Sequence, residues 1–317
     1  MGTGKYRLGL DVGGTNMTAG VIGEDFTVIS KANIPSGAGR SIEEITDDMV
    51  RCCTMAVGQS GIPMEDIASW GIGMPSCVNP STRMLVHANC FGWKNVPIYD
   101  YLEGRLPLPL KIDNDANCAA FGETLAGAAK GRKNVIMLTL GTGVGGGIVL
   151  DGKIYAVADG MEAELGHTKL VYDGELCTCG QKGCLESYCS ATALIRHAGE
   201  ALEKAPGSLI GKLCGGDRNV IDARMVFHAA AAGDQVATDL VEDYISRLAS
   251  GLSTFITIFR PESIILGGGV SNAGDQLYVP LNQKLAESTF GAEQIGVPEV
   301  IPAILGTDAG LVGAAFL

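Results

Sequence analysis

The chain has 317 residues, 46% hydrophobic and 18% charged, a balance typical of a globular protein with a well-filled core. Its length allows two domains, and its net charge of −12 disfavours binding to nucleic acid or to anionic membrane surfaces. The sequence has neither a charged-then-apolar leader nor a run of 18 apolar residues. We therefore expect a cytoplasmic protein whose ten cysteines are reduced or metal-bound.

The N-terminal residues predict a β-hairpin with a glycine-rich turn. An apolar strand at residues 6–10 ends in Asp11, the motif DVGGTN follows, and a second apolar strand covers residues 17–22. No helix follows this turn, so it matches neither a dinucleotide-binding fingerprint nor a P-loop. Glycine permits positive φ and lets backbone amides approach an anion, and Asp11 can hold Mg2+ through water at the strand end.

The next hundred residues predict helices alternating with strands. Residues 41–57 form an amphipathic helix that opens with a capping box of Ser41 and Glu44. Residues 116–129 form an alanine-rich helix. Apolar strands are expected at residues 67–72, 84–88 and 111–112.

The motif DNDAN lies between the last of these strands and the alanine-rich helix. Asp113, Asn114 and Asp115 are residue types that cap helices, and capping alone would explain them. Transfer of a phosphoryl group to an alcohol also needs a carboxylate that accepts the hydroxyl proton. From the residues alone, Asp113 and Asp115 are nearly equal candidates for that base. Asn114 would hold a neighbouring hydroxyl.

Residues 135–150 repeat the N-terminal pattern of apolar strand, Gly/Thr turn and apolar strand. The strands are expected at residues 135–140 and 148–150, with GTGVGGG between them, and Asp151 and Gly152 form a hairpin turn. One glycine-rich turn is weak support for phosphate binding. Two turns in equivalent positions, each with an added hydroxyl donor from Thr15 or Thr142, favour a phosphate-binding site.

The stretch ELGHTKLVYDGELCTCGQKGCLE, residues 164–186, predicts a zinc site. Three thiols lie within eight residues of one another, and the glycines between them permit a tight knuckle. Three Cys and one His complete a tetrahedron, and a closed shell favours a structural metal over a catalytic one. The alternative is that the cysteines are ordinary buried thiols. The candidate ligands are His167, Cys177, Cys179 and Cys184, and Glu164 and Glu186 flank them.

The remaining residues are mostly helical. A strand at residues 263–266 leads into three glycines, which form either a strand-to-helix turn or, through Gly268 and Gly269, a surface for adenine or its ribose. Strands alternating with helices predict an α/β protein whose two domains meet at a hinged cleft. Helices are expected at residues 191–204, 223–232, 235–259 and 275–288 and in the last turns of the chain.

Five motifs, DVGGTN, DNDAN, LGTGVGGG, ELGH and CxCGxxGCxE, resemble those of the ROK sugar kinases (repressor, open reading frame, kinase) in order and spacing. The resemblance covers nearly the whole chain. It implies the fold of actin and hexokinase, with two ribonuclease-H-like domains around a central cleft. We place the smaller domain at residues 1–117 plus 303–317 and the larger one, with its zinc knuckle, at residues 118–302.

The resemblance also implies residue roles. Asp115 matches the catalytic base, and His167 with the three knuckle cysteines matches the ligands of structural Zn2+. The two ATP-phosphate segments are residues 9–16, including Asp11, Gly13, Gly14, Thr15 and Asn16, and residues 141–148, including Gly141, Thr142 and Gly143. The sugar contacts are Asn114, Glu164, His167 and Glu186, with Ser76 and Asn89 less well defined.

The expected activity is ATP- and Mg2+-dependent phosphorylation of a hexose at its 6-hydroxyl. The segment VHANCFGWKNVPI resembles the glucokinase branch, and a homodimer is implied. Ser76 stands where the family commonly has glycine, and Glu162 and Ala163 also depart from its pattern, which opens the question of substrate. The alternatives are an N-acetylhexosamine, fructose or allose kinase, or a sugar-sensing protein without turnover.

Overall fold

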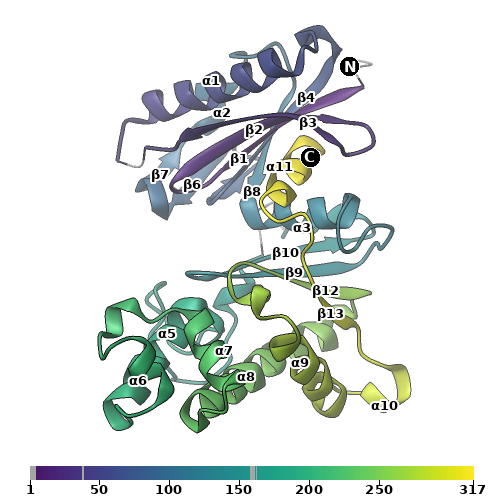
Figure 1. The fold of residues 1–317 in the computed structure, drawn as a ribbon. Helices are drawn as coiled ribbons and strands as arrows, with labels where there is room; N and C mark the ends of the chain where they lie inside the picture. The colour runs from purple at the N-terminus through teal and green to yellow at the C-terminus, as the bar shows by residue number, and fades with distance from the viewer. Residues whose placement is uncertain (1–4, 38, 158–160, 162) are drawn as a thin grey trace. The chain divides into compact units, whose positions relative to one another are not determined.

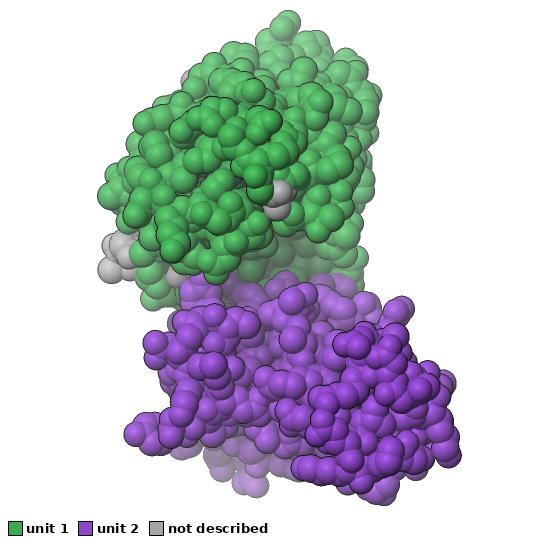
Figure 2. Space-filling model, turned by 90° about the vertical axis from the view of Figure 1, so that its left-hand side faces the viewer, with its two compact units in different colours: residues 1–137, 147–163, 304–317 green, residues 138–146, 164–303 purple. Residues whose placement is uncertain are grey.

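The computed structural model describes residues 5–37, 39–157, 161 and 163–317. They fall into two compact units (Figure 2): unit 1 comprises residues 1–137, 147–163 and 304–317, and unit 2 comprises residues 138–146 and 164–303. Unit 1 runs beyond residue 117, where we placed the domain boundary, because α3 (Asp115–Leu125) packs against the C-terminal helix α11 (Asp308–Ala315). Within the described part of the chain no helix is long and apolar enough to cross a membrane.

Unit 1 is built on a five-stranded sheet in the order β3-β2-β1-β4-β8. The predicted hairpin is confirmed, since β1 and β2 pair antiparallel, and Asp11 lies opposite Thr18. Strand β3 has no counterpart in the predicted elements, because its side chains alternate between exposed and buried at an edge of the sheet and form no apolar run. The strands are β1 (Tyr6–Val12), β2 (Asn16–Gly23), β3 (Val28–Pro35), β4 (Ile67–Met74) and β8 (Leu110–Asn114).

Helices cover both faces of this sheet (Figure 1). Helix α1 (Ile42–Ser60) begins with the predicted capping box and packs on the face that carries Leu8 and Leu10. Side chains alternate across a strand, so the residues between them face α11. There the packing is backbone to backbone: a Cβ on Gly71 would lie 1.7 Å from the carbonyl oxygen of Ala314.

A buried carboxylate fixes the point where the chain returns to unit 1. Glu123 is fully buried, and its Oε1 accepts hydrogen bonds from the amides of Ile304 and Leu305 at 2.9 and 2.8 Å. Its Oε2 accepts the amide of Ala128 at 2.7 Å, which turns the chain after Leu125. Helix α3 is therefore shorter than the predicted 116–129, because the Glu123 side chain replaces the helical partner of that amide.

A small three-stranded sheet, β5-β6-β7, completes the N-terminal part and lies along the chain between β4 and β8. Its middle strand has the predicted bounds. Its elements are β5 (Cys77–Asn79), β6 (Met84–Ala88), the 3-10 turn η2 (Asn89–Phe91), β7 (Trp93–Val96) and the short helix α2 (Ile98–Leu102); η1 (Met64–Asp66) precedes β4.

The second five-stranded sheet has the order β11-β10-β9-β12-β13, and β9 and β10 contribute residues to both units. Strand β10 begins four residues earlier than predicted, because the glycines at 145–147 extend the strand and do not form the turn. Asp151 and Gly152 both have positive φ, 51° and 73°, as a two-residue hairpin turn requires. The strands are β9 (Val135–Leu140), β10 (Val144–Leu150), β11 (Lys153–Ile154), β12 (Ser263–Gly267) and β13 (Glu299–Pro302).

Unit 2 is otherwise helical. Helices α5, α8 and α9 have the predicted bounds, and Asp222 caps α7 as expected by accepting the amide of Met225 at 2.7 Å. The helices are α4 (Glu186–Cys189), α5 (Ala191–Lys204), α6 (Leu209–Leu213), α7 (Ala223–Ala231), α8 (Gln235–Phe259), α9 (Asp275–Ser288) and α10 (Ala292–Ile295), with 3-10 turns η3 (Leu165–His167), η4 (Arg218–Val220) and η5 (Val270–Ala273).

Candidate active site

The first glycine-rich turn connects β1 to β2 in unit 1. The amide of Gly13 donates to the carbonyl oxygen of Asn16 at 2.8 Å, and Gly14, Thr15 and Asn16 are exposed. Gly13 and Gly14 do not have positive φ, so our expectation that the turn uses this freedom is wrong. Their value is the absence of side chains, which leaves the backbone open to an anion. Ser36, which the sequence did not single out, supports the turn by donating its hydroxyl hydrogen to the carbonyl of Gly13.

Asp11 lies half-buried at the end of β1, next to this turn. Burial, and secondly repulsion from the charge of Asp115, raises the pKa of the Asp11 carboxyl to about 7. The carboxyl group lies against Gly310 of α11, since a Cβ there would be only 2.9–3.0 Å from its atoms. Two carboxylates that repel each other beside an exposed phosphate-type turn form a place where a cation would be stabilised.

At the corner between β8 and α3, the three polar residues that open the DNDAN motif make different contacts. Asn114 is the helix cap, and its Oδ1 accepts the amides of Ala116 and Asn117 at 2.8 and 3.2 Å. The Asp113 carboxylate is turned inward and accepts from the Asn114 amide at 2.7 Å and from Asn117 Nδ2 at 2.9 Å. Burial raises the pKa of Asp113.

Asp115 is the first residue of the helix, and its Oδ1 accepts the Ala116 amide at 2.9 Å. This arrangement favours Asp115 over Asp113 as the reactive group.

Two of the less defined sugar contacts also belong to unit 1. Ser76 follows β4 and is buried, and its carbonyl oxygen accepts from Asn114 Nδ2 at 3.4 Å. The Ser76 hydroxyl has no hydrogen-bond partner among the described residues. Asn89 is exposed at the start of η2. The next residue, Cys90, would be 3.4 Å from a Cβ on Gly14, so this loop adjoins the first turn.

The second glycine-rich turn, at residues 141–143, belongs to unit 2. The amide of Gly141 donates to the carbonyl of Gly143 at 3.0 Å, and the carbonyl of Gly141 accepts the amide of Ala191, at the start of α5, at 2.8 Å. The amide of Val144 donates to Oε2 of Glu186 at 3.0 Å. Thr142 is exposed. This turn is therefore held by residues about 45 positions further along the chain.

The glycine run at residues 267–269 ends β12, and its middle residue lies against the start of this second turn. Gly268 has a φ of 83°, and a Cβ on it would be 2.5 Å from the carbonyl oxygen of Leu140. Gly269 opens η5. The run thus forms the predicted strand-to-helix turn, and it lies beside the second glycine-rich segment.

The four predicted metal ligands converge. The Nδ1 atom of His167 and the three Sγ atoms of Cys177, Cys179 and Cys184 all lie within 4.8 Å of one another. His167 Nδ1 is 3.6 Å from Cys177 Sγ, and Cys179 Sγ is 3.7 Å from Cys184 Sγ. A tetrahedron with Zn–S bonds of about 2.3 Å has edges of about 3.8 Å, so the donor set has the right spacing.

The two flanking glutamates differ in their surroundings. Glu164 is exposed and precedes η3. Glu186 begins α4, and its Oε1 accepts the hydroxyl hydrogen of Thr178 at 2.6 Å and lies 3.4 Å from Cys177 Sγ. The sequence did not indicate Thr178, because only the fold brings it to Glu186. Glu162, one of the departures from the family pattern, lies outside the described residues.

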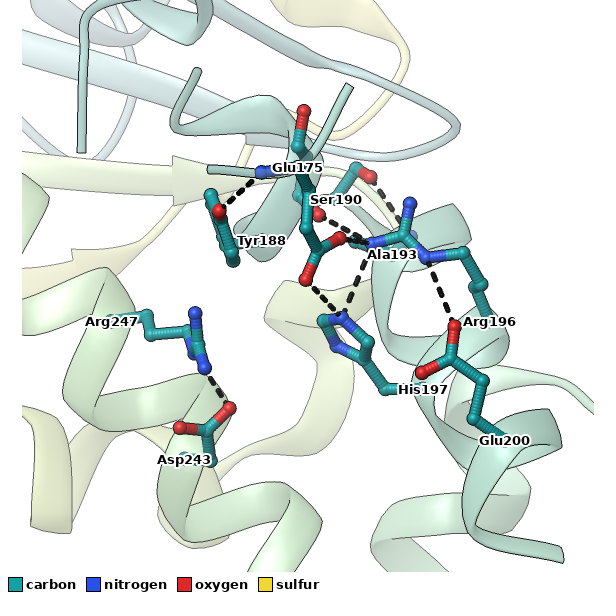
Figure 3. A network of polar contacts seen from close by, with 10 residues as sticks. Glu175, Tyr188, Ser190, Ala193, Arg196, His197, Glu200, Asp243 and Arg247 are labelled. Atoms are coloured by element: carbon teal, nitrogen blue, oxygen red, sulfur yellow. Dashed lines mark hydrogen bonds and ion pairs between the residues drawn. The ribbon is translucent and has the colours of Figure 1, made fainter. Parts of the chain in front are cut away.

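A polar network around Glu175 connects the chain just before the knuckle cysteines to neighbouring helices (Figure 3). Glu175, two residues before Cys177, accepts hydrogen bonds from Arg196 and, at 2.9 Å, from His197, both on α5. Its own amide donates to the Tyr188 hydroxyl at 2.7 Å. Arg196 also donates to the carbonyl of Ser187 at 2.8 Å. The network ties the knuckle to α4 and α5, and no short-range pattern in the sequence marks it.

Comparison with known proteins agrees with this arrangement. The model of the ROK family matches residues 7–317. A glucokinase from Streptomyces coelicolor is 36% identical over 313 residues, 98% of this chain and 96% of the relative, and an N-acetyl-D-glucosamine kinase from Aliivibrio salmonicida is 31% identical over 98% of each. A ROK family glucokinase from Streptomyces griseus, solved with glucose and AMPPNP, superposes with a TM-score of 0.81 at 34% identity and 98% coverage of both chains. The expected actin- and hexokinase-like α/β fold is thereby confirmed.

Proposed function

The chain belongs to the ROK family, and we propose that it is an ATP-dependent hexokinase with glucose as its preferred substrate. The observation that carries this proposal is the grouping in unit 1 of Asp115, Asp11 and an exposed glycine-rich turn. That grouping supplies a proton acceptor, a cation-binding carboxylate and open backbone amides, the three parts that phosphoryl transfer to an alcohol needs. The glucokinase relatives support glucose as the acceptor.

In the proposed reaction, the 6-hydroxyl oxygen of the hexose forms a bond to the γ-phosphorus of ATP. The bond from that phosphorus to the bridging oxygen breaks, and ADP leaves. Asp115 accepts the hydroxyl proton, and the electron pair of the broken O–H bond stays on the sugar oxygen as that oxygen bonds to phosphorus. Asp11 would hold Mg2+ through water, and this cation neutralises phosphate charge. Asn114 and Ser76 in unit 1, and Glu164, His167 and Glu186 in unit 2, would bind the other sugar hydroxyls, with Asn89 near them.

The nucleotide would use both glycine-rich turns. Residues 14–16 and residue 142 are exposed, so their amides would be open to the phosphates, and Thr15 and Thr142 would add hydroxyl donors. Gly268 and Gly269 would accept the adenosine end.

We also propose that one Zn2+ is bound by His167, Cys177, Cys179 and Cys184. The spacing of the four donor atoms fits a tetrahedral shell without an open position, so this metal would be structural. With Nδ1 of His167 directed at the metal, Nε2 stays available to a sugar hydroxyl. Elemental analysis of the purified protein should find one zinc per chain. A protein folded without zinc would refute this part.

The test of the catalytic assignment is Asp115→Asn. This change should lower kcat by at least about 100-fold, because general-base catalysis contributes roughly that much, while glucose binding by calorimetry is kept. Asp113→Asn is the matched comparison: its amide oxygen still accepts from Asn117 Nδ2 and from the Asn114 amide, so kcat should stay close to that of the wild type. Retained turnover in Asp115→Asn would remove Asp115 from the mechanism.

A second candidate, an N-acetylhexosamine kinase, is supported by the relatives at 31% identity. A panel of glucose, N-acetylglucosamine, N-acetylmannosamine, fructose and allose, assayed by ADP release, decides between them by kcat/KM. If sugars bind but none elicits ADP release, the chain is a sugar-sensing protein. The homodimer that the family resemblance implies should be visible by sedimentation analysis as twice the 32.9 kDa chain mass.

A further inference from the structure

The carboxylate of Glu186 is held at both of its oxygens by groups from different parts of unit 2. Oε2 accepts the amide hydrogen of Val144, which directly follows the second glycine-rich turn, at 3.0 Å. Oε1 accepts the hydroxyl hydrogen of Thr178, in the cysteine knuckle, at 2.6 Å. A glutamate that is free in solution samples many rotamers, whereas one held at both oxygens presents its remaining lone pairs in a fixed direction.

Besides its bond to Glu186, the Thr178 hydroxyl oxygen makes one longer contact, to Cys177 Sγ at 3.9 Å. Thr178 lies between Cys177 and Cys179 and is exposed, whereas Cys177 before it is buried. A threonine that only filled space would not need to stand at this exposed position. Its short hydrogen bond to a charged partner is the stronger explanation for its place in the structure.

Steric crowding shows that Glu186 has little freedom to move toward the turn. A Cβ on Gly143 would lie 2.4 Å from Oε2 of Glu186, so the carboxylate is pressed against the backbone of the turn. Thr178 holds the carboxylate from the other side. Without the Thr178 hydroxyl, Oε1 would keep only the 3.4 Å contact with Cys177 Sγ, and a cysteine that binds zinc as a thiolate has no hydrogen to donate. The Val144 amide would still hold Oε2.

We propose that Thr178 is a positioning residue for hexose binding, because its hydroxyl fixes the Glu186 carboxylate in the orientation that receives the sugar. This proposal rests on the proposed function, in which Glu186 contacts the hexose. In this proposal the Glu186 carboxylate also connects two segments of unit 2, because it accepts from Thr178 in the knuckle and from the Val144 amide after the second glycine-rich turn.

The test compares Thr178→Val with Thr178→Ser in the full-length, zinc-replete protein. Valine keeps the β-branched shape and replaces the hydroxyl by a methyl group, whereas serine keeps the hydroxyl and lacks the methyl group. Thr178→Val should raise the glucose KM and the glucose Kd from calorimetry about tenfold, a loss typical of a hydrogen bond to a charged group. Its KM for ATP at saturating glucose, zinc content and melting temperature should stay close to those of the wild type. Thr178→Ser should behave as the wild type.

The double variant with Glu186→Ala separates positioning from a direct effect. In the Glu186→Ala background, Thr178→Val should cause no further loss of glucose affinity, because the group through which it acts is absent. An additive loss would overturn the proposal, and so would an unchanged glucose Kd in Thr178→Val or a serine variant as weak as the valine one.

Failure of the proposed function has a different signature. If the wild type binds glucose without sugar-dependent ADP release, the kinase activity is refuted, and the calorimetric comparison of the two Thr178 variants still decides the positioning role. If the wild type phosphorylates glucose and Thr178→Val binds it equally well, only the positioning role is refuted. A wild type that binds none of the sugars in the panel would refute both.

Discussion

The two glycine-rich turns share a strand–turn–strand backbone but differ in what holds them. The first, at residues 13–15, is supported within its own neighbourhood, by the Asn16 carbonyl and the Ser36 hydroxyl. The second, at residues 141–143, is held by the Ala191 amide and by the Glu186 carboxylate. The same local pattern therefore yields a self-contained turn in unit 1 and, in unit 2, a turn whose shape depends on the knuckle and on α5.

Each turn also has a carboxylate next to it that is pressed against a glycine. Asp11 lies against Gly310 of α11, and Glu186 lies against Gly143 of the turn itself. In unit 1 the glycine is remote from the turn, so crowding there would move the carboxylate and leave the turn in place. In unit 2 the glycine belongs to the turn, so crowding would disturb both. Three variants test this difference.

The largest effect is expected for Gly143→Ala. Its Cβ would lie 2.4 Å from Glu186 Oε2, so the carboxylate must leave the Val144 amide. Unfolding should become easier by about 2 kcal/mol, as for other overpacked sites, and glucose affinity should fall. Gly14→Ala is the matched change in the first turn: its Cβ would meet Cys90 at 3.4 Å, an ordinary contact, and stability should change by less than about 0.5 kcal/mol. Equal losses in thermal melts of the two variants would contradict the comparison.

An intermediate effect is expected for Gly310→Ala. The added methyl group would push the Asp11 carboxyl from its place, which should raise the KM for Mg·ATP about tenfold, the factor for one misplaced contact to a charged group. Alanine favours a helix over glycine by about 1 kcal/mol, which offsets the crowding, so the melting temperature should hardly change. The glucose Kd should also stay the same. A glucose Kd that rises as much as the KM for Mg·ATP would show a general distortion and not a local one at Asp11.

The smallest effect is a pH dependence of stability caused by Asp11. Its pKa is about 7 in the folded protein and about 4 when unfolded, so between these values the folded state holds the extra proton. Stability of the Mg2+-free protein should therefore fall as pH rises from about 4 to 7. Asp11→Asn removes this term, and its stability relative to the wild type should increase over that range by an amount on the order of 1 kcal/mol, after allowance for partial exposure.

Thermal melts in Mg2+-free buffer at several pH values measure this difference. Because a bound cation favours the charged carboxylate, saturating Mg·ATP should reduce it. A difference between the two proteins that does not vary from pH 4 to 7 would show that the Asp11 carboxyl titrates at its ordinary value.

Elements with strong local signals could be predicted from the sequence. The helix at residues 235–259 was predicted with its observed bounds, and the spacing of the three knuckle cysteines and His167 was enough to predict a metal site. The choice between Asp113 and Asp115 was not available locally, because both follow the same strand. The family resemblance implied Asp115, and the hydrogen bond from Asn117 Nδ2 to Asp113 supports that prediction.

What the sequence could not provide are contacts made by tertiary packing. Thr178, Ser36 and Gly310 act on residues that are 8, 23 and 299 positions away in the chain. A lone Thr, Ser or Gly has many ordinary explanations, and nothing in its neighbours names its partner. The prediction of positive φ at the first turn was wrong for a related reason. A glycine can be required because it lacks a Cβ as well as because its backbone can adopt positive φ.

The buried carboxylate of Glu123 has a consequence for synthesis of the protein on the ribosome. It receives the amides of Ile304 and Leu305, and the helix that follows them covers the Gly71 side of the first sheet. These residues are made after residues 164–303, so until then Oε1 of Glu123 lacks both amide donors and the Gly71 side of the first sheet lacks its covering helix. Nascent chains usually fold domain by domain from the N-terminus. In this chain the residues of unit 2 are all made before the last residues of unit 1, so we expect unit 2 to complete its folding first.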